Sequence, residues 1–161
     1  MQRTIIRLVG TGALACGGLL GLAALPAGAT AQTGDATGFT MDLGPLPAPA
    51  NCPFGQTDDA SFTMLSGHGV MHDSTNKNGD WGGETIEGIA QFTVGSATYT
   101  GHLTLWGGGG FNAVGQNEGG ETLSFHGTGS SGTLDVQFSG HSTTSASGNQ
   151  SGHMSGNITC S

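Results

Sequence analysis

Six histidines are the residues with the clearest potential for chemistry in this chain. His68, His102, His141 and His153 each follow a glycine, and His126 precedes one. Imidazoles brought together by neighbouring strands are typical ligands of zinc or copper. The sequence therefore names His102, His126 and His141 as candidate metal ligands, and a metal ion as the cofactor they would imply. A plain polar face exposed to solvent is the competing interpretation, since the chain has no HxH or HExxH motif.

A second candidate site is the oxygen-rich segment from Asp73 to Glu84. Aligned on Gly79, it places Asn76 and Asn78 where an EF-hand loop has calcium ligands, but Asp73 and Glu84 fall one position out of register. Asn, Asp and Gly are also the usual residues of turns. The segment is therefore interpreted as a loop, with calcium binding as the alternative.

Signatures of known enzyme classes are absent from the sequence. There is no GxSxG nucleophile motif. The alternative of a small β-barrel enzyme, cyclase- or isomerase-like, would need the histidines to line an internal cavity. Whether the chain is an enzyme stays open, with the balance of the motifs against it.

The elements that must position these residues are β-strands. Between Thr85 and Trp106, apolar and polar residues alternate in two runs separated by Gly95-Ser96, which predicts a hairpin with one buried face. His102, His126, His141 and His153 fall on the polar parity. Similar alternation predicts six strands, at 60–72, 86–94, 98–106, 121–128, 133–142 and 152–160. With short connections and no helical period, these indicate an all-β, single-domain antiparallel up-and-down β-barrel or β-sandwich of about six to eight strands.

The beginning of the chain has the features of a secretory signal peptide. Arg3 and Arg7 precede an apolar run, and Ala29-Thr30-Ala31 forms a small-x-small cleavage site, so we expect residues 1–31 to be removed. Residues 32–51 are rich in proline and predict an extended leader, with a possible short strand at 39–41. Residues 52–161 then form the β-domain. No transmembrane segment is expected in the mature chain, and its location is expected to be extracellular.

Charge excludes one class of partner. Without Arg3 and Arg7, Lys77 is the only Lys or Arg beside eleven Asp and Glu residues. Because no basic patch can form, nucleic acid is excluded as a partner.

Cysteine usage agrees with export. Cys16 lies in the signal peptide, which leaves Cys52 and Cys160 to form a disulfide in an oxidising compartment. In a meander, these positions become neighbours if the sheet closes, so the bridge is expected to join the first strand to the last.

Three segments resemble a group of small secreted actinobacterial β-proteins of unknown function. They are Gly-His-Leu-Thr-Leu-Trp-Gly at 101–107, the following N-x-x-G-x-N, and Gly127-Thr128-Gly129 ahead of a C-terminal cysteine. The resemblance implies an exported β-domain and carries over no catalytic residue. Together, these features favour binding or interaction at the cell exterior. An enzyme and a metal-binding exported protein are the alternatives. A binding role and an enzyme differ in where His102, His126 and His141 point: outward for binding, and into a cavity for an enzyme.

Overall fold

The computed structural model describes residues 29–46, 49–55 and 58–161, which form eight β-strands and no helix. None of these residues belongs to a helix that could cross a membrane. The predicted signal peptide lies outside the described residues except for Ala29, Thr30 and Ala31. These three begin β1, so the expected cleavage point falls inside that strand. The strands are β1 (Ala29–Asp35), β2 (Thr40–Pro45), β3 (Asp59–Asn76), β4 (Gly79–Val94), β5 (Ala97–Asn112), β6 (Asn117–Gly129), β7 (Gly132–Thr144) and β8 (Gln150–Cys160).

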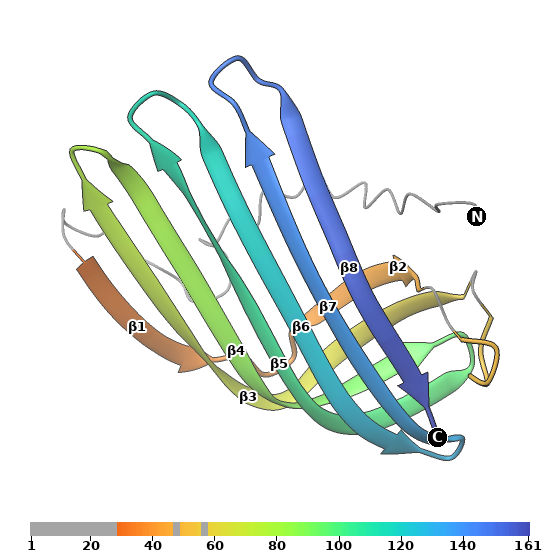
Figure 1. The fold of residues 1–161 in the computed structure, drawn as a ribbon. Helices are drawn as coiled ribbons and strands as arrows, with labels where there is room; N and C mark the ends of the chain where they lie inside the picture. The colour runs from red at the N-terminus through yellow and green to blue at the C-terminus, as the bar shows by residue number, and fades with distance from the viewer. Residues whose placement is uncertain (1–28, 47–48, 56–57) are drawn as a thin grey trace.

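All eight strands belong to one antiparallel sheet with up-and-down topology (Figure 1). From β3 to β8 each strand pairs with the next one in the chain, and β1 and β2 both pair with β3. β1 lies beside residues 68–74 of β3, and β2 lies beside residues 59–63. The predicted all-β, single-domain antiparallel fold is therefore confirmed. The sheet does not close into a barrel, and its form is sandwich-like.

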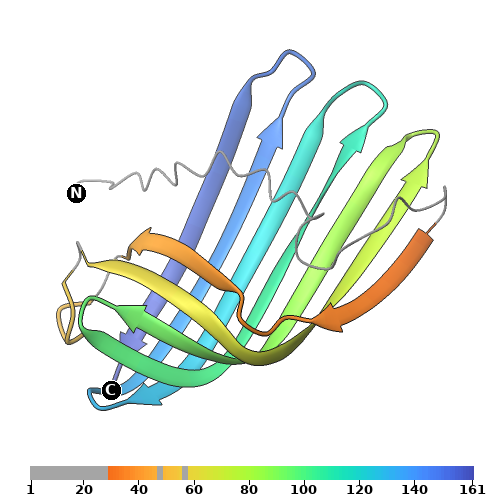
Figure 2. The same ribbon diagram turned by 180° about the vertical axis from the view of Figure 1, so that it is seen from behind.

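One end of the sheet folds over itself. The first half of β3, β2 and the adjoining ends of β4 and β5 curve across the ends of β6, β7 and β8 (Figures 1 and 2). The apolar sides of both layers meet there, as Phe92 on β4 and Phe125 on β6 show, with ring centroids 5.1 Å apart. We call this the packed end. Burial of these side chains is the main source of its stability. Its fully buried large side chains are Phe62, Met64, Phe92, Val94, Tyr99, Leu103, Phe125, Leu134 and Val136.

Glycines allow the strands to approach closely at the packed end. Gly101 and Gly127 face each other on β5 and β6, and a Cβ on Gly101 would lie 2.0 Å from the carbonyl oxygen of His126. A side chain at this position would force the two strands apart. In the turn between β4 and β5, Gly95 has a φ of 55°, which only glycine adopts readily and which supports the predicted hairpin.

The disulfide between Cys52 and Cys160 is present, with Cα atoms 5.2 Å apart. Cys52 lies in the connection that leads into β3, the strand predicted as the first, so the bridge ties the start of that strand to the end of β8 as expected. The expected closure of the sheet is wrong. Asn51 donates a hydrogen bond from Nδ2 to the carbonyl oxygen of Cys160, 2.9 Å away, beside the bridge. Folding of the sheet over itself brings the two cysteines together without closure.

The opposite end, which we call the open end, consists of three long hairpins whose tips lie at residues 77–78, 113–116 and 145–149 (Figure 1). The segment from Asp73 to Glu84, interpreted from the sequence as a loop, is mostly paired in the first hairpin and leaves a turn of only two residues between β3 and β4. The glycine-rich segment 107–120 likewise contributes the paired ends of β5 and β6. Glycine-rich composition suggested loops, but regular cross-strand pairing keeps these glycines in strands. No residue from Trp106 to Thr122 is buried.

Part of the proline-rich segment 32–51 pairs with the sheet. It contributes part of β1 and all of β2, and Thr40 and Met41 of the possible short strand lie in β2. β2 pairs with β3 through a register shift between Asp42 and Gly44. The ladder tolerates Pro45 because that residue ends the strand.

Candidate recognition surface

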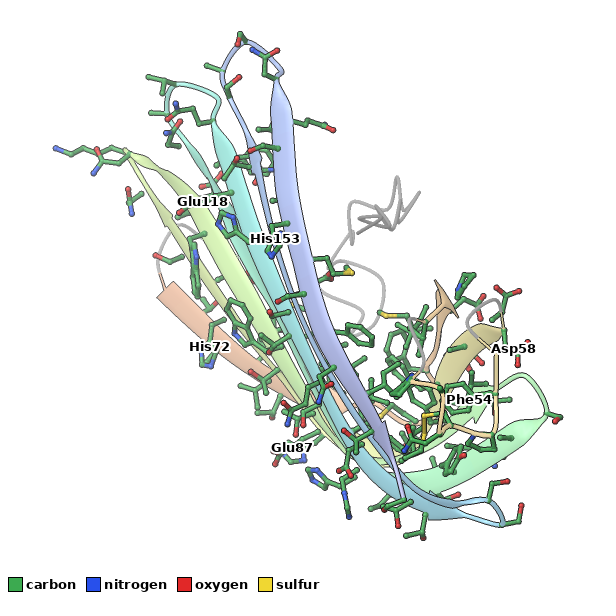
Figure 3. All side chains as sticks on the ribbon, turned by 45° about the vertical axis from the view of Figure 1, so that its right-hand side comes forward. Phe54, Asp58, His72, Glu87, Glu118 and His153 are labelled. Carbon is green, nitrogen blue, oxygen red and sulfur yellow. A yellow bond between two sulfur atoms is a disulfide. The ribbon has the colours of Figure 1, made fainter. Side chains whose placement is uncertain are left out.

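Cross-strand register determines which polar residues become neighbours on the face of the sheet that points away from the core. His72, Glu87 and Glu118 lie on this outer face, on the opposite side of the sheet from Phe54 (Figure 3). His102 follows the same rule, because it is exposed while the next residue, Leu103, is fully buried. The polar parity expected from the sequence is thus the outer face.

The candidate metal ligands do not gather at one place. His102 is directly opposite His126 on the neighbouring strand, whereas His141 is opposite Gly120 on one side and His153 on the other. Among the described residues, no three His, Cys, Asp or Glu side chains are grouped so that they could hold a metal ion. The structure therefore forms two separate histidine pairs in place of a three-histidine site.

Two histidines have carboxylate neighbours instead. His68 Nε2 lies 3.3 Å from Glu87 Oε1, and His126 Nδ1 contacts Asp135 Oδ1. The four side chains are between 46% and 68% exposed, so each pair contributes little to stability. The alternative of a barrel enzyme required His102, His126 and His141 to line a cavity, and these residues lie on the exposed outer face instead.

The predicted calcium loop is also rearranged. Asp73 is on β3 opposite Gly82, and Glu84 is on β4 opposite Met71. Because the segment is a hairpin, its oxygen ligands are distributed along two strands and do not surround a common point. Burial raises the pKa of the Glu84 carboxyl above its ordinary value.

The most distinctive feature of the outer face is a pair of exposed indoles at the open end. Trp81 on β4 is 50% exposed and Trp106 on β5 is 37% exposed. A Cβ on Gly83 would lie 3.2 Å from Cη2 of Trp81, and a Cβ on Gly108 would lie 3.0 Å from Cζ2 of Trp106. Each indole therefore rests on the backbone of the glycine two residues further along its own strand.

These glycines form one continuous row across the sheet. Gly83 pairs with Gly108, and Gly108 pairs with Gly120 on β6. The indole of Trp106 extends over Gly120 as well, where a Cβ would lie 3.4 Å from Cζ3. We call the two tryptophans and these three glycines the indole platform.

Histidines and hydroxyl groups surround the indole platform. His72 pairs with Gly83 at one end of the glycine row, and His141 pairs with Gly120 at the other. Two rows of outer-face residues flank the glycine row. The row on the side of the core contains Thr85, Thr122, Ser139 and Ser155, and the row on the side of the hairpin tips contains Ser74, Thr143 and Ser151. The Oγ atoms of Ser139 and Ser155 are 2.9 Å apart, and Thr143 Oγ1 lies 2.7 Å from Ser151 Oγ.

An open groove of about 750 Å³ adjoins the platform at the hairpin tips. It shares Trp81 with the platform, and Phe111, Asn112 and Glu118 also line it. Phe111 is 60% exposed but belongs to the opposite face, because it is one residue from Gly110, the partner of Trp81. Exposed aromatic side chains beside a groove are typical of binding surfaces.

Sequence reasoning missed the platform. From the sequence, Trp81, Tyr99, Trp106 and Phe111 could line a pocket for a sugar or lipid, but packing in the core and at its rim was the favoured interpretation. The signal that could have found it is a repeated pattern, Trp81-Gly82-Gly83 and Trp106-Gly107-Gly108, in which the second glycine is on the same face of a strand as the tryptophan.

Comparisons with other proteins provide no family for this chain: no family model matches it, and neither curated proteins nor solved structures gave a significant match.

Proposed function

We propose that this chain is a binding module that acts at the cell exterior, and that the outer face at the open end is its recognition surface. The observation that carries the proposal is the exposure of Trp81 and Trp106 on the indole platform. Tryptophan dominates many binding surfaces because one side chain offers a large, rigid contact area together with a hydrogen-bond donor. Exposing two indoles without a functional reason would favour aggregation.

Two further features support the proposal. The packed end holds a core of aromatic and aliphatic side chains that includes Phe62, Phe92 and Phe125, whereas the two exposed indoles lie outside this core. The disulfide between Cys52 and Cys160 suits an exported protein, since such bridges persist in oxidising compartments.

The test is retention on washed actinobacterial cell walls, which are sedimented after incubation with the purified full chain. We expect the wild type to sediment with the walls and the variant with Trp81→Ser and Trp106→Ser to remain in solution. Val114→Ser is the control, because it removes an exposed apolar side chain from the tip of a neighbouring hairpin, outside both the platform and the groove. Wild-type protein that stays in solution, or equal retention of the double variant, would contradict the proposal.

A further inference from the structure

We infer that the indole platform binds a neutral, ribbon-like polysaccharide through stacking of its sugar rings on Trp81 and Trp106. This inference rests on the proposed function and names the ligand class for the same surface. It depends on three properties of the surface: the orientation of the indoles, the polar groups around them and the charge of the chain.

The orientation of the indoles favours stacking. Ring atoms of both tryptophans lie against glycine backbone, Trp81 at Gly83 and Trp106 at Gly108 and Gly120, while a large part of each indole stays exposed. We expect this exposed part to include the ring face that points away from the sheet. A pyranose ring presents an apolar face of C–H groups, which packs against an aromatic face. The edge of that sugar ring carries hydroxyl groups that need hydrogen-bond partners.

Such partners are present beside the indoles. The serine and threonine hydroxyls of the adjacent rows donate and accept hydrogen bonds, as does the imidazole of His72 or His141. A purely apolar partner, such as a lipid chain, would leave these groups without hydrogen bonds when it covered them.

Charge argues for a neutral ligand. The full chain carries a formal charge of −8, and Glu118 is the only carboxylate that the register places in the platform row or the two rows beside it. An anionic polymer would be repelled by the chain as a whole, and no Lys or Arg is present in these rows to offset the repulsion.

The row of residues that contains the three glycines sets the direction that a bound polymer would follow. Together with its flanking histidines, this row runs across the strands from His72 on β3 to His153 on β8, a distance of about 24 Å for six strands spaced about 4.8 Å apart. A polysaccharide with equatorial linkages presents successive ring faces in nearly one plane and can follow this row. A flexible, coiling α-linked glucan cannot keep successive rings on the flat surface.

Intrinsic fluorescence provides a direct test, because Trp81 and Trp106 are the only tryptophans in the sequence. The full chain is titrated with hydroxyethylcellulose while the indoles are quenched with acrylamide. We expect this polymer to protect the indoles. Carboxymethylcellulose, which has the same backbone with added carboxylates, and dextran, an α-linked glucan, should protect them much less.

A pair of glycine variants tests the geometry. Gly108→Ala places a Cβ 3.0 Å from the Trp106 ring and 3.2 Å from the carbonyl oxygen of Gly82, so the indole must move. Because the required shift is small, we expect a several-fold loss of affinity for hydroxyethylcellulose, less than the roughly tenfold loss that removal of a whole stacking contact would cause. Gly107→Ala is the matched control, because its Cβ would face the other side of the sheet with no atom within 4 Å.

The outcomes separate this inference from the proposed function. If hydroxyethylcellulose gives no protection while retention on cell walls still depends on the tryptophans, the polysaccharide assignment is wrong and the binding module stands. Equal protection by dextran, stronger protection by carboxymethylcellulose, or equal affinity of the two glycine variants would also overturn the assignment. If neither protection nor retention occurs, both proposals fail.

Discussion

The packed end and the open end belong to the same strands, yet they differ in how their surfaces are used. At the packed end, the inner face is buried in a two-layered core that contains Phe92, Tyr99 and Leu134. At the open end, glycine replaces these side chains and both faces are largely exposed, with no buried residue from Gln137 to Asn157. Strand pairing continues through both ends without interruption in β5, β6 and β7. The comparison indicates that the packed end supplies stability and holds the register of the hairpins that present the binding surface.

The largest effect is expected from the disulfide at the packed end. Cys52→Ser frees the connection between β2 and β3 from β8 by opening a link across 108 residues. The chain-entropy model gives a loss of about 4 to 5 kcal/mol for a loop of this length. Thermal denaturation should show a strongly lowered melting temperature, and reduction of the wild type should reproduce it. An unchanged melting curve would mean that the two layers hold together without the bridge.

A matched pair of substitutions compares the two ends directly. Phe92→Ala removes a ring with no exposed surface and should cost about 3 to 5 kcal/mol of unfolding free energy. Phe111→Ala removes a ring that is 60% exposed and should change the unfolding free energy by less than about 0.5 kcal/mol. Urea denaturation of both variants measures the difference. Similar costs would show that the open end contributes to the core after all.

The smallest effect concerns Glu84, on the inner face where β4 leaves the packed end. Burial raises the pKa of this carboxyl in the folded state, so the folded protein binds its proton more tightly than the unfolded chain does. Stability from this group is therefore lost as the pH rises through the folded pKa, and it is retained below the unfolded pKa. Glu84→Gln should raise the melting temperature slightly at about pH 7 and leave it unchanged at about pH 3. A variant that is less stable than the wild type at neutral pH would indicate a stabilising contact of the carboxylate.

The sequence by itself determined the local features of the molecule. Alternation around Phe92 and Leu103 predicted strands with one buried side, and Gly95-Ser96 predicted the turn between two of them. The polar parity placed His102 and His126 on the exposed face, and the count of cysteines left Cys52 to pair with Cys160. These features follow from the period of a β-strand and from the chemistry of single residues, so they need no knowledge of distant neighbours.

Only the tertiary structure decided how the strands are combined. Glycine has no side chain to mark a face, so the pattern from Gly107 to Gly110 could not reveal that β5 continues to Asn112. Cross-strand register separated His141 from His102 and His126, and aligned Gly83, Gly108 and Gly120 beneath the indoles. The choice between a closed barrel and a sheet folded over itself also depends on curvature summed over many residues. Parity is a local property of a strand, whereas register and curvature arise from contacts between residues far apart in the chain.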